Sequence, residues 1–240
     1  MKDGTIGAPP QVVVVTGAAG NLGRAVAEAF ARDGARLVLV DRDANALRAA
    51  FAATLPEALC LPVDLLARAE VEAMAAQALE RFGRIDALCN LAGGFRMGEA
   101  VHETSEQTWE AMMDLNVATL LNAVRAVVPR MLAQPGGGAI VNVGAAAALG
   151  GGAHMGAYAA AKSAVIRLTE SMAAELRTRG INVNCVMPTV LDTPENREAM
   201  PDADPTNWVA PRDLASVIRF LASPAARAVH GAAVPVRGMV

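Results

Sequence analysis

The sequence contains few aromatic residues. Phe, Trp and Tyr make up 3% of its 240 residues, and Tyr158 is the single tyrosine of the chain. Alanine and glycine supply much of the 53% hydrophobic content, so we expect a core that packs by close backbone approach rather than through large rings. With 19% charged residues, the composition is typical of a globular protein with ample core material.

Cysteine is also scarce, and the cysteines show no paired spacing. Cys60, Cys89 and Cys185 each lie in an apolar run. An odd number of unpaired cysteines argues against a disulfide framework and against a zinc site. We therefore expect buried free thiols and no metal site.

The chain lacks an excess of positive charge and long apolar runs. The formal net charge is −3, and the positive charges are scattered singly, which argues against binding to nucleic acid or to an anionic membrane. By inspection, no stretch reaches the roughly 20 apolar residues that span a bilayer. The N-terminal MKDGTIGAPP has no apolar core of signal-peptide length. The sequence predicts a cytoplasmic protein.

Short β-branched runs alternate with longer alanine-rich helical stretches. The strands are continuously apolar, which is expected when helices cover both faces of a sheet. Such repetition builds right-handed units on a parallel sheet, so we expect one doubly wound α/β domain over 1–240. The expected strands are 11–17, 36–41, 58–64, 85–90, 139–143 and 181–186, and a short apolar run, 232–236, follows the last helix. The expected helices are 21–33, 43–54, 68–82, 105–133, 156–178 and 212–222.

One segment, 188–210, departs from this pattern. It is long and polar and contains several prolines. Loops of this kind are often functional lids. We expect this segment to cover a substrate site.

The stretch TGAAGNLG, from Thr16 to Gly23, follows the first expected strand and opens the first expected helix. Its glycines allow a tight turn, close backbone approach and close packing of helix on strand, as in a Rossmann fold. The freed amides at the helix N-terminus suit a pyrophosphate. The expected cofactor contacts here are Gly17, Gly20, Asn21, Leu22 and Gly23. The alternative is a purely structural turn.

The next expected strand ends at Asp41. A carboxylate there can accept hydrogen bonds from both ribose hydroxyls of a dinucleotide. It would also repel a 2′-phosphate by about 4 kcal/mol at about 4 Å and an effective dielectric of about 20. We therefore favour NAD(H). Arg42 could hold a phosphate, so NADP(H) stays possible, and the alternative role for Asp41 is a helix N-cap.

These features together resemble the short-chain dehydrogenase/reductase family. The matching motifs are TGAAGNLG, NLAG at 90–93, Asn116, YAAAK at 158–162 and the proline after the sixth strand. The resemblance covers essentially the whole chain. It implies a nicotinamide-dependent oxidoreductase that acts on a small molecule. It also implies a homodimer or homotetramer paired through the helices 105–133 and 156–178.

The resemblance assigns further cofactor contacts. Asp64 is expected to hydrogen-bond the adenine, and Leu65 to line the same pocket. The remaining contacts that it implies are Asn90, Ala92, Gly93, Pro188 and Thr193. Two positions depart from the family pattern, because Leu91 replaces the usual second asparagine and Thr189 replaces the usual glycine after the proline.

Tyr158 and Lys162 are four residues apart and share one helical face. A nearby ammonium favours the phenolate and lowers the phenol pKa from about 10. The resemblance implies that Tyr158 donates or accepts the proton and that Lys162 binds the nicotinamide ribose. It further implies that Asn116 holds a water connected to the lysine. The alternative is an ordinary tyrosine on a surface helix.

A catalytic serine is missing from the expected site. The family usually carries it thirteen residues before the tyrosine, where this chain has Ala145, and no serine or threonine occurs over 136–161. Loss of such a donor costs about 3–4 kcal/mol at a developing oxyanion. His154 could supply the hydrogen bond instead, or it could be an exposed histidine without this role.

A branch of the family that reduces quinonoid dihydropterins is similar in lacking this serine. It is also similar in AGG at 92–94 and in the loop at 187–208. The similarity implies a conjugated C=N or C=O substrate. A general carbonyl or 3-oxoacyl reductase and a non-catalytic NAD(H)-binding protein are the alternatives. The residues that could wall a flat ring, or could merely anchor the lid, are Phe95, Met97, Met200 and Trp208.

Overall fold

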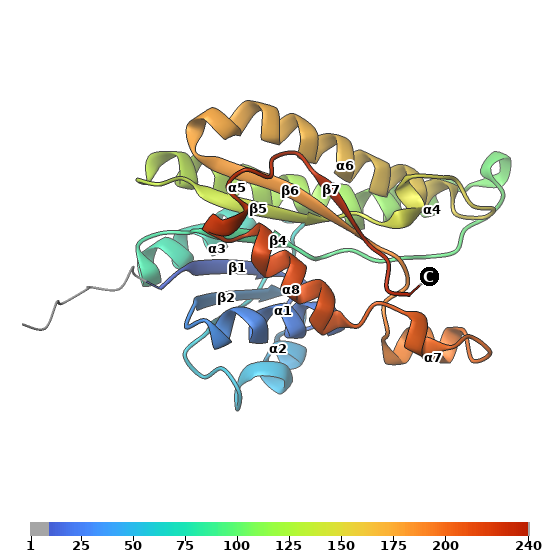
Figure 1. The fold of residues 1–240 in the computed structure, drawn as a ribbon, viewed down its shortest axis with the longest axis horizontal. Coiled ribbons are helices and arrows are strands. Elements are labelled where there is room, and N and C mark those ends of the chain that lie inside the picture. Colours follow the sequence, from blue (N-terminus) through green and yellow to red (C-terminus); the bar gives the residue numbers. More distant parts are fainter. Residues whose placement is uncertain (1–9, 240) are drawn as a thin grey trace, which may run out of the picture.

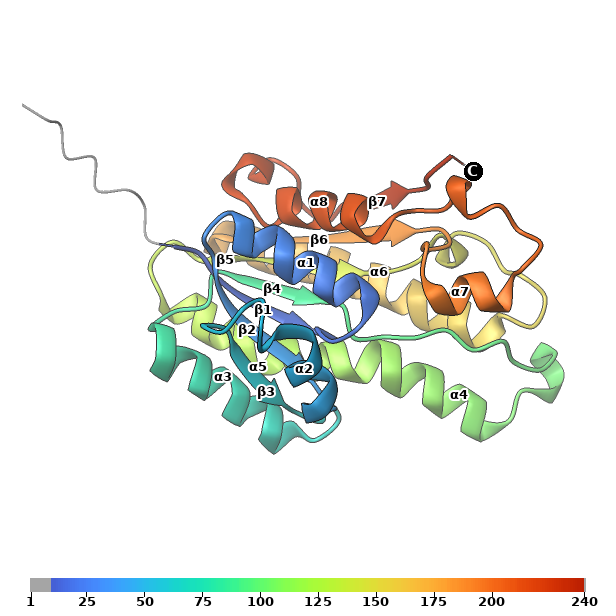
Figure 2. The same ribbon diagram turned by 90° about the horizontal axis from the view of Figure 1, so that it is seen from below.

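The computed structural model describes residues 10–239, and its centre is a seven-stranded parallel sheet. The strand order is β3-β2-β1-β4-β5-β6-β7, and helices cover both faces (Figures 1 and 2). The strands are β1 (Val12–Thr16), β2 (Arg36–Asp41), β3 (Leu59–Pro62), β4 (Ala87–Asn90), β5 (Gly138–Val143), β6 (Ile181–Pro188) and β7 (Ala233–Val236). This is the doubly wound α/β sheet that the sequence predicts.

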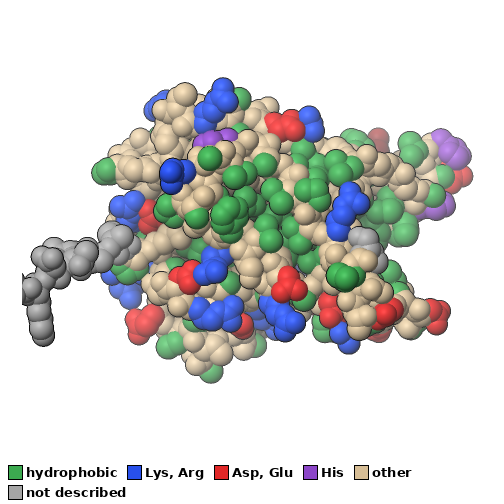
Figure 3. Space-filling model, viewed as in Figure 1, with side chains coloured by type: hydrophobic (Ala, Val, Ile, Leu, Met, Phe, Trp, Pro, Cys, Tyr) green, Lys and Arg blue, Asp and Glu red, His purple; other side chains and the backbone are tan. Residues whose placement is uncertain are grey.

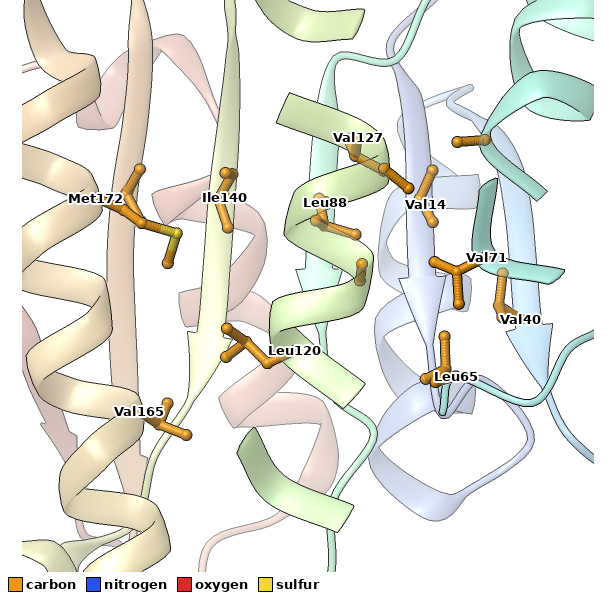
Figure 4. Packing of buried hydrophobic residues seen from close by; sticks show 14 of the residues in the cluster. Val14, Val40, Leu65, Val71, Leu88, Leu120, Val127, Ile140, Val165 and Met172 are labelled. Atoms are coloured by element: carbon orange, nitrogen blue, oxygen red, sulfur yellow. The ribbon is translucent and has the colours of Figure 1, made fainter. Parts of the chain in front are cut away.

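Alternate residues of each central strand pack into two separate hydrophobic cores, one on each face of the sheet. In β1, Val12 and Val14 join the core on one face, whereas Val13 and Val15 join the core on the other. The first core packs under α3 (Arg68–Phe82), α5 (Thr119–Ala133) and α6 (Gly156–Leu176), as Figure 4 shows. The second packs under α1 (Asn21–Arg32), α2 (Ala44–Phe51) and α8 (Pro211–Leu221). Burial on both faces explains why these strands are apolar throughout.

The expected helix 105–133 is interrupted by a π-helical turn. It consists of α4 (Glu106–Met113), the π-turn Asp114–Ala118 and α5. Single π-turns inside α-helices are rare and often lie at functional sites. This turn contains Asn116, one of the expected catalytic residues.

The same helical run, Glu106–Ala133, is the one helix in the described part of the chain that is long and apolar enough to cross a membrane. Charged residues interrupt it, so it is not a continuous apolar run in the sequence. Half of its most apolar window is buried inside the protein, where Leu120, Ala123 and Val127 join the core under α5. Core packing therefore accounts for this apolar face.

The expected lid at 188–210 contains regular structure. It includes α7 (Pro194–Ala199) and a short 3₁₀ turn, Pro205–Asn207. The two ends of the segment are paired, because Leu191 bridges Val209 and the Asp192 N–H donates to the Val209 carbonyl at 2.9 Å. The segment therefore leaves and rejoins the body at a single point.

The expected oligomer stays a prediction. One face of the protein nevertheless shows hydrophobic side chains gathered near β7 and α8 (Figure 3). Most of the edge strand β7 is only half-buried, and Phe220 of α8 is 46% exposed. This apolar surface lies apart from the two long helices through which pairing was expected.

Candidate active site

The turn between β1 and α1 is fastened to the segment that follows β4. Gly17 has a φ of +64°, and a Cβ there would lie 2.9 Å from the Cα of Ala92. The Thr16 hydroxyl accepts hydrogen bonds from the Leu91 N–H at 3.0 Å and the Ala92 N–H at 3.2 Å. Only glycine fits position 17, so the expected close backbone approach is present.

The first turn of α1 has the features of an anion site. Gly20 is its N-cap and provides no side-chain cap for the helix amides. A Cβ at Gly23 would overlap the Gly17 carbonyl oxygen, so helix and turn pack without side chains between them. Backbone N–H groups at such a helix start suit a pyrophosphate, which is the fit that a dinucleotide requires.

Asp41 ends β2 beside this turn. Its Oδ2 accepts a hydrogen bond from the Ala19 N–H at 3.1 Å. The following helix, α2, is capped instead by Asp43, which accepts from the Asn45 and Ala46 N–H groups. The helix-cap alternative for Asp41 is therefore wrong. The ribose role of Asp41 stays a prediction, and the neighbouring Arg42 is exposed.

The expected adenine residues follow β3 at the same edge of the sheet. Asp64 is exposed, and its Oδ1 accepts from the Leu66 N–H at 2.9 Å in a local turn. Leu65 is 7% exposed, and its carbonyl accepts from Asn122 Nδ2 at 2.9 Å. Their contacts with a cofactor stay predictions.

Asn116 fixes the chain just beyond β4. Its Oδ1 accepts from the Gly94 N–H, and its Nδ2 donates to the carbonyls of Gly94 and Met112, all at 3.1 Å. A Cβ at Gly93 would lie 2.8 Å from Asn116 Oδ1 and 3.2 Å from Lys162 Nζ. The structure thus brings Gly93, Asn116 and Lys162 together, as expected, while the water between Asn116 and Lys162 stays a prediction.

Lys162 extends from α6 into the interior. It is 5% exposed, and its Nζ donates to the Val143 carbonyl at the end of β5, at 2.9 Å. Burial lowers the pKa of Lys162 to about 8, partly offset by the nearby Cys185. The ammonium therefore has a fixed place at the carboxyl edge of the sheet.

Tyr158 lies one turn earlier on α6 and is half-buried. Burial raises its pKa to about 12, so the expected lowering by Lys162 is wrong for the protein without cofactor. The physical reason is that loss of solvent disfavours the phenolate, while the Lys162 ammonium is bonded to Val143. Phe95 packs edge-on against the Tyr158 ring, with centroids 4.9 Å apart at 85°.

Ala145 follows β5 and is 6% exposed, so a methyl group lies where the family usually has a hydroxyl. His154 is exposed and has a φ of +61°. Its main-chain carbonyl accepts from the Gly98 N–H at 2.8 Å. His154 thus fastens the loop after β4 through its main chain, which agrees with the alternative of an exposed histidine.

The other expected substrate residues are dispersed. Met97 is 58% exposed on the loop that carries Phe95, which is itself 54% exposed. Met200 and Trp208 are half-buried in the segment 188–210. The main chain of Trp208 lies against Gly238, where a Cβ would approach the Trp208 carbonyl carbon to 3.0 Å. This main-chain contact joins the segment 188–210 to the end of the described chain, and the role of the Trp208 side chain stays a prediction.

Polar residues behind the site tie the sheet to α6. Asn90 Nδ2 donates to Asn142 Oδ1, and Asn142 Nδ2 donates to Thr169 Oγ1, both at 2.9 Å. Asn90 Oδ1 is buried and has no partner among the described residues.

The two remaining expected cofactor residues lie at the start of the segment 188–210. Pro188 is buried at the end of β6. Thr193 caps α7, because its Oγ1 accepts from the Asn196 N–H at 3.2 Å.

Three contributors to the site have no recognisable signal in the sequence. Thr16 lay within the glycine motif, but nothing showed that its hydroxyl would hold the segment after β4. Val143 acts through its carbonyl, so its side chain gave no signal. Glu195 of α7 accepts a hydrogen bond from Asn21 Nδ2 at 2.8 Å, a contact between residues far apart in the chain.

A cavity of about 560 Å³ lies at the opposite edge of the sheet. It is lined by the loops 34–37 and 54–58 and by the end of α3. These segments precede β2 and β3, whereas the glycine turn, Ala145 and Tyr158 gather where strands end. We assign this cavity no part in the chemistry.

Comparisons with known proteins agree with this geometry. The family model described as short chain dehydrogenase matches residues 11–204. D-threitol dehydrogenase of Mycolicibacterium smegmatis is 37% identical over 240 residues, covering 95% of this chain and 92% of that protein. Sorbitol dehydrogenase of Cereibacter sphaeroides is 37% identical over 182 residues, covering 76% of this chain and 71% of that protein.

Three solved structures share the fold. NAD⁺-bound xylitol dehydrogenase has a TM-score of 0.86 at 26% identity, covering 95% of this chain and 98% of that one. The 3-ketoacyl-(acyl-carrier-protein) reductase of Brucella melitensis in complex with NADH has a TM-score of 0.85 at 27% identity, covering 96% of this chain and 98% of that one. A short-chain oxidoreductase of Pseudomonas aeruginosa PAO1 is described as containing an atypical catalytic center. It has a TM-score of 0.87 at 28% identity, covering 95% of this chain and 96% of that one.

Four of these proteins are named as polyol dehydrogenases or as a 3-ketoacyl reductase. None of the five is named as a dihydropterin reductase, so they do not support that narrower similarity. The family itself is established by the match over most of the chain and by relatives that are similar over nearly their full length. The chain therefore belongs to the short-chain dehydrogenase/reductase family and is an NAD(P)-dependent oxidoreductase.

Proposed function

We propose that the protein is an NADH-dependent reductase of a flat, conjugated substrate, with Tyr158 as the proton donor. A quinonoid dihydropterin, or a related conjugated C=N or C=O compound, is the substrate class that we favour. One observation carries this proposal. The chain has the buried methyl group of Ala145 where the family usually has a second hydrogen-bond donor, and the phenol of Tyr158 packs against Phe95.

The cofactor would be held by residues at the carboxyl edge of the sheet. The amides at the start of α1 suit the pyrophosphate, and Asp41 favours an unphosphorylated ribose because its charge repels a 2′-phosphate. Lys162 would bind the nicotinamide ribose. When bound, NADH supplies the hydride of the reduction.

The protein supplies the matching proton. A phenol whose pKa is raised to about 12 is protonated at neutral pH, so the proton is present for reduction, and a fall of this pKa when the cofactor binds would make Tyr158 a stronger donor. The substrate gains a hydride, which is one hydrogen with two electrons, from the cofactor. It gains a proton from Tyr158 Oη. Solvent then reprotonates the phenolate, and Lys162 and Asn116 are placed to take part in that path.

The missing hydroxyl favours a delocalised acceptor. Reduction of an isolated ketone develops charge on one oxygen, and loss of a donor to such an oxyanion costs about 3–4 kcal/mol. A quinonoid ring spreads the charge over several nitrogens. Such a substrate needs the proton from Tyr158 but not a second donor from position 145.

Phe95 supports a flat substrate. Its ring lies edge-on to Tyr158, and 54% of the residue is exposed on the loop after β4. An exposed aromatic ring beside the proton donor offers an apolar contact for a planar heterocycle. It offers no hydrogen bond to a polyol.

A second candidate is a more general carbonyl reductase or alcohol dehydrogenase. It is favoured by the similarity to D-threitol dehydrogenase over nearly the whole of both chains. In this case the enzyme would work with Ala145 at reduced efficiency or with a donor from elsewhere.

A panel of substrates separates the two candidates. NADH oxidation is followed with quinonoid dihydropterin, an acetoacetyl thioester and a simple diketone, each against an enzyme-free control. Turnover of the pterin alone supports the first proposal. Turnover of the thioester or the diketone without the pterin contradicts it and supports the second. Tight NADH binding without turnover of any compound would contradict both.

A further inference from the structure

Glu195 joins the expected lid to the cofactor site. This exposed residue of α7 accepts a hydrogen bond through Oε2 from Asn21 Nδ2, at 2.8 Å. Asn21 is the first residue of α1 and follows the glycine turn directly. Figure 2 shows α7 near the same end of α1. The contact therefore lies at the mouth of the expected pyrophosphate site.

The orientation of Asn21 is set by Arg24, one turn along α1. Arg24 donates a hydrogen bond from Nη2 to Asn21 Oδ1 at 3.0 Å. Because the amide oxygen accepts and the amide nitrogen donates, this contact directs Nδ2 toward Glu195. Three side chains thus form a chain from α1 to α7.

Glu195 is charged at neutral pH. Its own main-chain N–H, Thr193 and Asn21 all donate to the carboxylate and lower its pKa, and Arg24 adds a smaller favourable charge. A bound pyrophosphate would place further negative charge at the start of the same helix. The carboxylate and the pyrophosphate then repel each other, and dissolved salt partly screens this repulsion.

We propose that Glu195 is an anionic latch. It holds α7 against Asn21 while the cofactor site is empty, and it competes with the pyrophosphate of the dinucleotide for the start of α1. Glu195 thereby weakens cofactor binding and speeds cofactor release. This inference rests on the cofactor site and is independent of which substrate is reduced.

The fold of α7 does not depend on this latch. Arg197 donates to both carboxylate oxygens of Asp192, at 2.6 and 2.9 Å. Asn196 Nδ2 donates to the Leu191 carbonyl at 2.8 Å, and Thr193 caps the helix. Substitution of Glu195 therefore leaves α7 with its own local contacts.

The latch is tested by cofactor binding without turnover. Dissociation constants of NADH, ADP-ribose and adenosine are measured for the wild type and for Glu195→Gln by titration calorimetry. We expect NADH and ADP-ribose to bind about two- to fivefold more tightly to the variant, the range of an exposed charge interaction. Adenosine, which has no phosphate, should bind equally to both, and the gain should shrink at high salt.

Two further variants sharpen the test. Glu198→Gln removes the same charge from an exposed position of α7 and should change the affinity for NADH less than Glu195→Gln. Glu195→Ala removes the hydrogen bond as well and should also tighten binding. Unchanged or weaker NADH binding by Glu195→Gln would overturn the latch. So would an equal effect of Glu198→Gln, or weaker binding by Glu195→Ala, since the last result would mean that the contact supports closure over the cofactor.

Discussion

The ammonium of Lys162 donates a hydrogen bond to the main-chain carbonyl of Val143, at 2.9 Å. This contact joins α6 to the end of β5 and holds a buried charge one helical turn from Tyr158. A main-chain acceptor cannot be removed by substitution, so the position of the ammonium depends on the sheet itself. This arrangement costs free energy, because the Lys162 ammonium is removed from solvent.

The burial of Lys162 predicts a pH-dependent stability. Its folded pKa of about 8 lies below its ordinary 10.5, so the unfolded chain binds more protons between these pH values and stability rises with pH across that window. The full effect is about 3 kcal/mol. Lys162→Met should lack this rise.

Urea unfolding of wild type and Lys162→Met at pH 7, 9 and 10 checks this directly. The difference between the two proteins cancels the titration of Cys89 and Tyr158, which occurs in both, and reports Lys162 together with its charge interaction with Cys185. A constant difference across the series would show that Lys162 does not titrate in this window.

Tyr158 can be titrated without interference from other phenols, because it is the single tyrosine of the chain. Without cofactor, little phenolate absorbance should develop below the region of pH 12, the raised pKa. NAD⁺ should move the onset to lower pH, since a cationic ring near the phenol favours the phenolate. An onset that NAD⁺ does not move would place Tyr158 away from the nicotinamide.

Tyr158→Phe should lower kcat by about 10²–10⁴-fold, the usual contribution of a general acid. NADH affinity should be unchanged, because the ring and its edge-on contact with Phe95 are retained. Steady-state kinetics and a binding titration on the same preparation measure both quantities. Full turnover by the variant would remove the phenol from the mechanism.

Cofactor choice should depend on the charge of Asp41. Asp41→Asn keeps an acceptor for the Ala19 N–H and removes only the charge, whereas Asp41→Ala removes both. Each variant should raise the NADPH/NADH ratio of kcat/KM by about tenfold or more, because the repulsion of the 2′-phosphate is relieved. If the ratio stayed at its wild-type value in both variants, Asp41 would not be the ribose ligand.

The sheet could be predicted from the sequence because its signal is local. The valines of β1 are buried on both faces, and continuous apolar runs are typical of such strands. The glycine turn was equally predictable, since Gly17 has a φ of +64° and lies against Ala92. In each case a few adjacent residues determine the conformation.

The parts that could not be predicted depend on distant contacts or on main-chain atoms. The π-turn at Asn116 has no simple sequence pattern, and Glu195 meets Asn21 only in the folded chain. The pKa of Tyr158 was expected to fall because Lys162 is near in sequence, but burial, which spacing does not reveal, raises it.

We expect Ala145 to direct the enzyme toward a substrate that needs one donor rather than two. The measurement is kcat/KM for quinonoid dihydropterin and for a simple diketone, in the wild type and in Ala145→Ser. We predict that the new hydroxyl raises diketone reduction by about 10²-fold or more and leaves pterin reduction unchanged. An equal rise for both substrates, or a wild type that reduces the diketone better than the pterin, would contradict the account.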